Sequence, residues 1–389
     1  MSGFLADADL SVNRLEQARR RAAERGYLDL TSSNPTQQGM LFPPGVLRAA
    51  ADDYWSTRRY APDPHGLPIA RAAVANYYAH RTPPDQINPN SIFMTASTSE
   101  AYSLLFALLT EPGDNILAPD ITYPLFEYLA TIHHIELRPY RLVEERGWQI
   151  DPESLHAQVD RHSRGVLIIS PHNPTGMIVQ TPVSALDELG LPVICDEVFA
   201  EFTYRAAFTP PFTTLHPHVP VFMLNGISKL FALPDLKLGW IALNTPAAQR
   251  YAERLEVLND TFLGASSLIQ SMLPQLFERS TGFVSTMRTT VRDNLDMALE
   301  MLSYCPGVRA HSPDGGYYLF PEVPDWDSEE ELVLHLLDAG VLVHPGYFYG
   351  TSRGVHIMLS ALTERATLRA GLSRLIQSLN LPHTPHTGK

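Results

Sequence analysis

The chain is poor in cysteine, in positive charge and in long apolar runs. Only Cys195 and Cys305 occur in its 389 residues, so we expect no disulfide framework and a reducing, cytoplasmic setting. The 29 basic residues against 42 acidic ones give a net charge of −13, which argues against a nucleic-acid partner, because a polyanion is bound through Lys and Arg. No stretch approaches the roughly 18 apolar residues of a membrane span, and no signal peptide is apparent.

The order of apolar runs predicts two domains. Short β-like runs alternate with helical segments up to about residue 245, which is typical of an α/β domain with a mostly parallel sheet. Beyond that point come helices and then a smaller α+β pattern. We therefore expect an N-terminal segment, 1–44, that packs on the small domain. A large domain is expected over 45–285 and a small C-terminal domain over 286–389.

Polar residues follow three of the apolar runs. Asn173 comes after VLIIS, Asp196 after PVIC, and Lys229 after VFMLN. In open α/β sheets, ligands bind at the carboxyl ends of the strands, where a desolvated lysine can form a Schiff base with a carbonyl. Each residue also has an ordinary interpretation: Asn-Pro-Thr-Gly makes a turn, an aspartate caps a helix, and most lysines are solvated. The three together favour a ligand site.

In this order and with these flanks, the chain resembles the class I/II aminotransferases that depend on pyridoxal phosphate, the fold-type I group. The resemblance runs from about residue 30 to about residue 375. It implies a large α/β domain and a smaller α+β domain, the cofactor pyridoxal 5′-phosphate, and transfer of an amino group from an amino acid or related amine to a keto acid. It also implies that Lys229 binds the cofactor and moves a proton, that Asp196 pairs with the protonated pyridine nitrogen, and that Asn173 hydrogen-bonds the phenolic oxygen.

The same resemblance implies further cofactor contacts. Ser97 and Thr98 begin a helix whose N–H groups suit a phosphate. Ser228 adjoins the lysine, and Lys237 stands where the family normally has a phosphate-binding arginine. Tyr123 matches the aromatic residue stacked on the cofactor ring. Tyr60 matches a tyrosine that reaches the phosphate in the neighbouring subunit, which implies a homodimer.

Several positions depart from the family pattern. Gly226 stands where a serine often contributes a hydroxyl, and Ser97 where a glycine is usual. Phe199 replaces a tyrosine whose hydroxyl also donates to the phenolic oxygen. Because Phe199 cannot donate, we expect the nitrogen that joins lysine and cofactor to be more basic than usual.

The substrate pocket departs as well. Met358, in VHIMLSAL, replaces the arginine that normally binds the substrate carboxylate, and Ser33 stands where a glycine is common. Either the amino donor lacks a free α-carboxylate or another arginine binds it. The candidates are Arg353 and the pair Arg58-Arg59.

Other functions stay open at this stage. Cofactor motifs are shared by lyases and decarboxylases on the same fold, so fold alone does not choose the reaction. A non-catalytic protein that binds pyridoxal phosphate is a further alternative. The sequence contains no HExxH or CxxC spacing for a metal and no G-x-S-x-G elbow for a serine nucleophile.

Overall fold

The computed structural model describes residues 10–380 apart from 146, 325 and 351–352. Its contacts divide the chain into two compact units. The larger unit consists of Met40–Arg288 with Asp314–Gly316. The smaller unit joins the described residues up to Gly39 with Thr289–Pro313 and those from Tyr317 onward. The sequence boundaries at 44/45 and 285/286 lie within five residues of these limits.

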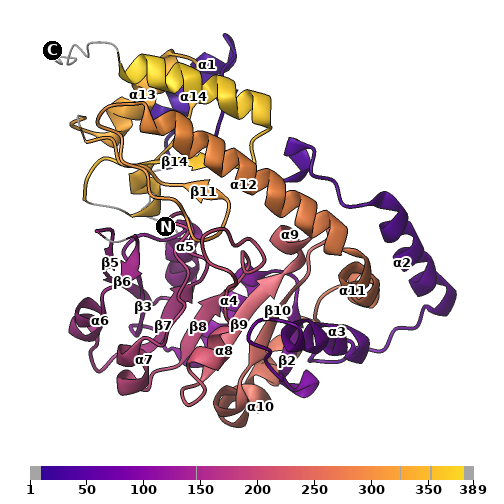
Figure 1. Cartoon of the computed structure of the whole chain (residues 1–389). Helices are drawn as coiled ribbons and strands as arrows, with labels where there is room; N and C mark the ends of the chain where they lie inside the picture. The colour runs from indigo at the N-terminus through magenta and orange to yellow at the C-terminus, as the bar shows by residue number, and fades with distance from the viewer. Residues whose placement is uncertain (1–9, 146, 325, 351–352, 381–389) are drawn as a thin grey trace. The chain divides into compact units, whose positions relative to one another are not determined.

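A seven-stranded sheet forms the larger unit (Figure 1). Its strand order is β2-β10-β9-β8-β7-β3-β4. Strands β9, β8, β7, β3 and β4 run parallel, whereas β10 is antiparallel to both β9 and β2. The expected mostly parallel α/β sheet is therefore confirmed, with one reversed strand. The strands are β2 (Ile92–Thr95), β3 (Asn115–Pro119), β4 (Glu136–Tyr140), β7 (Ser163–Ile169), β8 (Val193–Asp196), β9 (Val221–Gly226) and β10 (Gly239–Leu243).

Helices connect and cover these strands. The central strands are buried along nearly their whole length, as expected for a sheet covered on both faces. The main apolar core includes side chains of α4, α10 and the adjoining strands, among them Tyr102, Leu224 and Leu255. The helices are α2 (Pro44–Thr57), α3 (Pro68–Ala79), α4 (Thr98–Leu109), α5 (Leu125–Ile132), α6 (Pro152–Gln158), α7 (Ser184–Leu189), α8 (Phe212–Leu215), α9 (Ile227–Leu230), α10 (Thr245–Thr261) and α11 (Ser267–Arg279).

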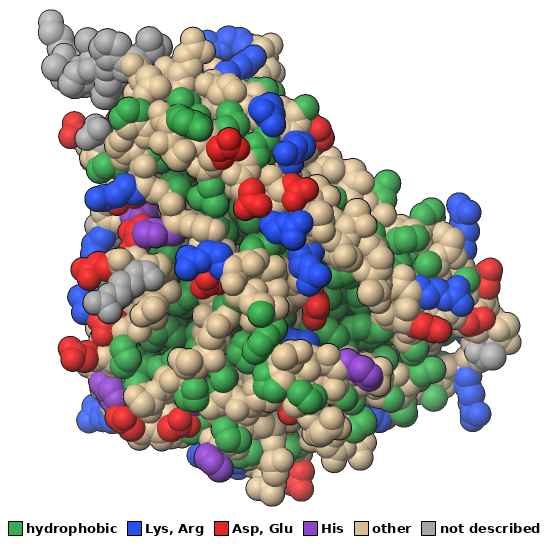
Figure 2. All heavy atoms as spheres, in the orientation of Figure 1, with side chains coloured by type: hydrophobic (Ala, Val, Ile, Leu, Met, Phe, Trp, Pro, Cys, Tyr) green, Lys and Arg blue, Asp and Glu red, His purple; other side chains and the backbone are tan. Residues whose placement is uncertain are grey.

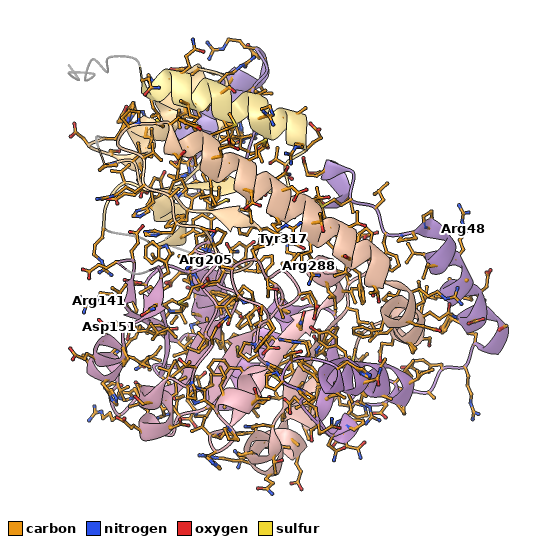
Figure 3. The ribbon with its side chains drawn as sticks, viewed as in Figure 1. Arg48, Arg141, Asp151, Arg205, Arg288 and Tyr317 are labelled. Carbon is orange, nitrogen blue, oxygen red and sulfur yellow. The ribbon has the colours of Figure 1, made fainter. Side chains whose placement is uncertain are left out.

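A small hairpin lies outside the main sheet of this unit. Strands β5 (Leu142–Val143) and β6 (Gln149–Ile150) pair antiparallel. Arg141 and Asp151 flank the hairpin, and their side chains form an ion pair (Figure 3). Acidic and basic side chains intermingle over the face shown in Figure 2, in keeping with a surface that is charged but not one-signed.

The smaller unit combines both ends of the described chain. Strand β1 (Leu28–Asp29) pairs in parallel with β12 (Val341–Leu342), so the N-terminal segment packs within this unit. A three-stranded sheet consists of β11 (Tyr318–Leu319), β14 (Ile357–Ser360) and β13 (His344–Pro345). Its helices are α1 (Arg14–Ala23), α13 (Glu329–Asp338) and α14 (Arg365–Leu379), and the long α12 (Thr281–Ser303) passes from one unit to the other.

Across the described residues, no helix is long and apolar enough to cross a membrane.

Candidate active site

Three neighbouring parallel strands bring the predicted ligand residues to one edge of the sheet. Asp196 is the last residue of β8, and it is paired in register with Ile169 at the end of β7 and with Leu224 in β9. Asn173 lies four residues beyond Ile169, and Lys229 lies in the short helix that follows β9. The carboxyl ends of parallel strands lie at the same edge of the sheet, so the three residues that end or follow these strands in the sequence lie at one edge in the fold.

Asp196 is a buried carboxylate with two neutral donors. Its Oδ2 accepts a hydrogen bond from the Tyr102 hydroxyl at 2.9 Å, and its Oδ1 accepts one from the Val198 N–H at 3.0 Å. Burial raises the pKa of Asp196 to about 6, and these hydrogen bonds together with the positive charge of Lys229 oppose that rise. A carboxylate in this state gains from a further cationic partner.

Lys229 is also desolvated. Burial lowers the pKa of its amine to about 8, and the negative charge of Asp196 opposes the shift. A larger fraction of this amine is therefore neutral near pH 7 than for a surface lysine, and the neutral amine is the nucleophile.

The loop that carries Asn173 is held by a buried histidine. His172 Nε2 lies 3.0 Å from the carbonyl oxygen of Ile121, and its Nδ1 lies 2.9 Å from Thr175 Oγ1. Burial lowers the pKa of His172 to about 4, so the ring is neutral and donates from Nε2 to the carbonyl. Among the described residues, the buried Oδ1 of Asn173 has no hydrogen-bond partner. The amide is thus held in place with bonding capacity left for a ligand.

The N-terminus of α4 lies at the exit of β2. Ser97 caps the helix and its Oγ accepts from the Glu100 N–H at 3.1 Å, while Glu100 Oε2 accepts from the Ala96 N–H. The two bonds satisfy the N–H groups of Glu100 and Ala96 at the start of the helix. The N–H groups of Thr98 and Ser99 belong to the first turn, where the helix itself offers no acceptor, and they suit an anion.

The region around Gly226 explains one departure from the family pattern. A Cβ at this position would lie 2.8 Å from the Leu238 carbonyl oxygen and 3.1 Å from Gly239 Cα. The antiparallel strand β10 therefore leaves no room for the serine that is frequent here. Lys237, just before β10, is exposed and adopts a left-handed backbone with φ of 51°.

Three further predicted residues of the larger unit differ in exposure. Tyr123 is 44% exposed, with its ring 6.1 Å from that of Phe126. Tyr60 is 76% exposed in the single chain, and Ser228 is half-buried beside Lys229. Aromatic side chains as exposed as Tyr60 and Tyr123 either face solvent or contact a ligand or a second subunit.

The smaller unit holds the predicted substrate residues. Ser360, at the end of β14, donates from its Oγ to the Ser32 carbonyl and from its N–H to the Leu30 carbonyl, so the turn that carries Ser33 lies against the strand that carries Met358. Met358 is 1% exposed and pairs with His344 across the sheet. Ser33 and Arg353 are both exposed.

Glu197 adjoins Asp196 but belongs to a different cluster, which the sequence analysis missed. Its Oε2 lies 3.2 Å from Arg81 Nη1, and its Oε1 accepts from the Phe212 N–H at 2.8 Å. Arg81 Nη2 also donates to the Thr209 carbonyl at 2.7 Å. Arg81 also lines a cavity of about 680 Å³ in the larger unit, together with Glu201 and with Arg288, which is labelled in Figure 3.

Tyr102 is a second residue that the sequence analysis missed. Its apolar neighbours in AYSLLFALL mark it as a core residue, and only the folded chain brings its hydroxyl to Asp196.

Comparison with known proteins decides the family. Residues 25–375 match the profile of the family described as aminotransferase class I and II. The chain belongs to this family. Its members use pyridoxal 5′-phosphate, and this chain is an aminotransferase of the fold-type I group, as the sequence predicts.

Individual aminotransferases support this placement. A tyrosine aminotransferase of Dictyostelium discoideum is 30% identical over 275 residues, which are 67% of this chain and 66% of that protein, or just under two thirds. The Mus musculus tyrosine aminotransferase is 27% identical over 82% of this chain and 76% of its own length. A solved alanine aminotransferase from Pyrococcus furiosus has the same fold, with a TM-score of 0.89, 23% identity and coverage of 97% of this chain and 99% of that one.

The residues present in this aminotransferase fit the cofactor of the family. A protonated pyridine nitrogen would supply a cation to the buried Asp196, and a ring oxygen could bond the amide of Asn173. The first turn of α4 offers N–H groups to a phosphate. Each of these groups has bonding capacity that such a cofactor could use.

Proposed function

We propose that Lys229, Asp196 and Asn173 form the cofactor site at which this aminotransferase moves an amino group from an amino acid to a keto acid. The observation that carries the proposal is the underpaired carboxylate of Asp196 at the end of β8, with the amine of Lys229 close enough to affect its pKa. The expected roles agree with what each side chain has available for bonding.

Each residue has a distinct task in this site. When bound, pyridoxal phosphate withdraws electrons from the carbon that carries the amino group. Asp196 holds a proton at the pyridine nitrogen, and Asn173 hydrogen-bonds the ring oxygen. The amine of Lys229 would hold the cofactor and, once the substrate has displaced it, would accept and return the proton at the substrate Cα.

The phosphate site would keep the positive charge that is usual in the family but lose the two-pronged donor of an arginine and the hydroxyl of a serine. We assign Ser97, Thr98 and Ser228 to it through N–H and hydroxyl donors, and Lys237 as a point charge. Gly226 offers no hydroxyl, and steric contact with β10 explains why. Tyr123 is assigned to the face of the cofactor ring.

We also propose that the active unit is a homodimer in which Tyr60 serves the neighbouring subunit. Tyr60 shares the larger unit with other strongly exposed apolar side chains: Leu263 (81%), Val257 (69%), Trp55 (56%) and Ile69 (54%). Exposed apolar groups in this number favour a protein partner. Mixing Tyr60→Phe with Lys229→Ala subunits then restores activity, because each hybrid dimer has one intact site. A monomeric active protein rules the arrangement out.

The amino donor is proposed to be an α-amino acid whose carboxylate is bound by an arginine other than the usual one. Met358 is buried within its own sheet and offers no charge. Arg353 and the Arg58-Arg59 pair are exposed. The tyrosine aminotransferases among the relatives act on an α-amino acid, which supports a donor of this class.

A donor screen tests this assignment. A charge-assisted contact with a carboxylate contributes about 1.5–3 kcal/mol, so its loss costs roughly tenfold to a hundredfold in kcat/KM. We expect that loss in Arg353→Ala or in Arg58→Ala/Arg59→Ala with standard α-amino acids. Undiminished turnover of several such donors in both variants contradicts the proposal. If the enzyme prefers amines without a carboxylate, then Met358, in place of the usual arginine, marks a pocket for donors that lack this group.

We further propose a cytoplasmic location. Both cysteines are free and buried, as expected of thiols that are kept reduced. Cell fractionation followed by immunodetection checks this, and recovery in a secreted fraction contradicts it.

A further inference from the structure

The hydroxyl of Tyr102 is fixed beside the carboxylate of Asp196. Tyr102 lies on α4, is 2% exposed, and belongs to the main core of the larger unit. Its ring packs 4.6 Å from that of Phe126 and 6.1 Å from that of Phe106. The hydroxyl lies 2.9 Å from Asp196 Oδ2. Because the ring is held by core packing, the donor has a fixed position before any ligand arrives.

The surroundings of Asp196 contain one charge and two neutral donors. The amine of Lys229 contributes the charge, and the Val198 N–H and the Tyr102 hydroxyl contribute the hydrogen bonds. Cys195 precedes Asp196 in β8 and is buried. Glu197 bonds Arg81 and Phe212 instead. A carboxylate has about four lone-pair sites, so two neutral hydrogen bonds leave acceptor sites for a cation.

We propose that Tyr102 is a positioning residue that keeps Asp196 ionised and correctly oriented to receive a protonated ring nitrogen, and that it thereby sets the lower pH limit of cofactor binding. The inference rests on the role proposed above for Asp196. A hydrogen bond from a neutral hydroxyl stabilises the anion without neutralising it, so the charge remains available to the ligand.

The direction of the expected effect follows from the environment of the carboxylate. Burial raises the pKa of Asp196 to about 6, and the hydrogen bond from Tyr102 works against burial. Without that hydroxyl the pKa of Asp196 rises further, toward neutrality. A protonated Asp196 cannot pair with a protonated ring nitrogen, so affinity for the cofactor falls at a higher pH than in the wild type.

The test is the pH dependence of the dissociation constant for pyridoxal phosphate, measured by fluorescence titration of the apo protein. In Tyr102→Phe, the pH at which affinity is half lost rises by about one to two units, the size expected for a hydrogen bond to a charged group. Tyr140→Phe is the matched control. Tyr140 is 1% exposed, and its hydroxyl donates to the Leu167 carbonyl at 2.9 Å, so this variant loses an equivalent bond without affecting Asp196.

A graded variant keeps the test independent of folding. Replacing Tyr102 with 3-fluorotyrosine keeps the shape and makes the phenol a stronger donor, so the midpoint falls below that of the wild type. If the Phe and fluorotyrosine variants both keep the wild-type midpoint, the inference is overturned. A shift of equal size in Tyr140→Phe would overturn it too, because the effect would then be structural.

Asp196→Asn separates this inference from the proposed function. If Asp196→Asn removes the loss of affinity near pH 6 while Tyr102→Phe leaves its midpoint unchanged, the role of Tyr102 alone is refuted. A wild-type profile in Asp196→Asn refutes the assignment of Asp196 itself, and with it the role proposed for Tyr102.

Discussion

Asp196 and Glu197 are consecutive buried carboxylates, and they differ in what neutralises them. Glu197 is 0% exposed and is paired with Arg81, with a backbone N–H on its other oxygen. Asp196 is 7% exposed, and its hydrogen bonds come from a neutral hydroxyl and a backbone N–H. The nearby amine of Lys229 is itself desolvated enough that burial lowers its pKa to about 8.

Under the proposed function, this difference separates a charge with a structural role, Glu197, from a charge that serves a ligand, Asp196. A buried ion pair with satisfied hydrogen bonds is complete within the chain, and removing one partner leaves an uncompensated charge. A buried carboxylate that lacks a full countercharge destabilises the protein while the site is empty. Binding of a cation removes that cost. Perturbed groups of the second kind cluster at functional sites.

The largest expected effect is on turnover in Asp196→Ala. Loss of the group that holds a proton at the pyridine nitrogen should reduce kcat by roughly 10²–10⁴-fold, the range for a catalytic acid or base. The apo protein should remain folded, because a destabilising buried charge has been removed. Steady-state kinetics and a thermal melt measure the two quantities. Near-normal turnover in this variant would mean that another acid serves the cofactor.

Glu197→Ala should show the opposite pattern. The variant leaves the guanidinium of Arg81 buried, with a side chain only 5% exposed and no carboxylate, which costs about 3–5 kcal/mol of the free energy of unfolding. Urea denaturation of the apo protein checks this. The folded fraction should keep far more activity than Asp196→Ala keeps. If the two variants lose stability equally, the distinction between the two carboxylates fails.

The stability of the apo protein should depend on pH through both site residues. The folded pKa of Asp196, about 6, lies above its ordinary 3.8, so its contribution to stability is complete below about pH 4 and is lost as the pH rises toward 6. The folded pKa of Lys229, about 8, lies below 10.5, so the unfolded chain binds more protons between these values and stability rises with pH there.

Single substitutions isolate these two slopes. Asp196→Asn should remove the loss of stability between about pH 4 and 6, and Lys229→Met should remove the gain in stability between about pH 8 and 10.5. Each slope is at most about 1.4 kcal/mol of unfolding free energy per pH unit. Denaturant midpoints across the pH range measure both. Unchanged slopes in the two variants would show that the groups are not perturbed in the folded protein.

The smallest expected effect comes from Phe199→Tyr. Phe199 is 2% exposed and offers no hydroxyl. A tyrosine there should add one donor to the ring oxygen and lower the pKa of the nitrogen that joins Lys229 to the cofactor. A spectrophotometric pH titration of the bound cofactor in both proteins measures this pKa. An unchanged midpoint rejects the explanation.

Sequence alone predicted the residues that follow directly from strand ends. Asn173, Asp196 and Lys229 each follow an apolar run that forms a strand. Because these strands pair in parallel, their carboxyl ends lie at the same edge of the sheet. Tyr102 is 94 positions from Asp196, and Arg81 is 116 from Glu197, so only tertiary packing reveals these contacts. The clash that excludes a serine at Gly226 arises from the reversed strand β10, which the apolar pattern does not distinguish from a parallel one.

The central claim is that Lys229 carries the cofactor, and chemical trapping tests it most directly. The chain has only three lysines, Lys229, Lys237 and Lys389, so the site of attachment can be read without ambiguity. The purified protein is loaded with pyridoxal phosphate, reduced with borohydride, digested and analysed by peptide mass. We predict the modification on Lys229, retained in Lys237→Gln. Attachment to another residue, or no binding by folded protein at saturating cofactor, would contradict the account.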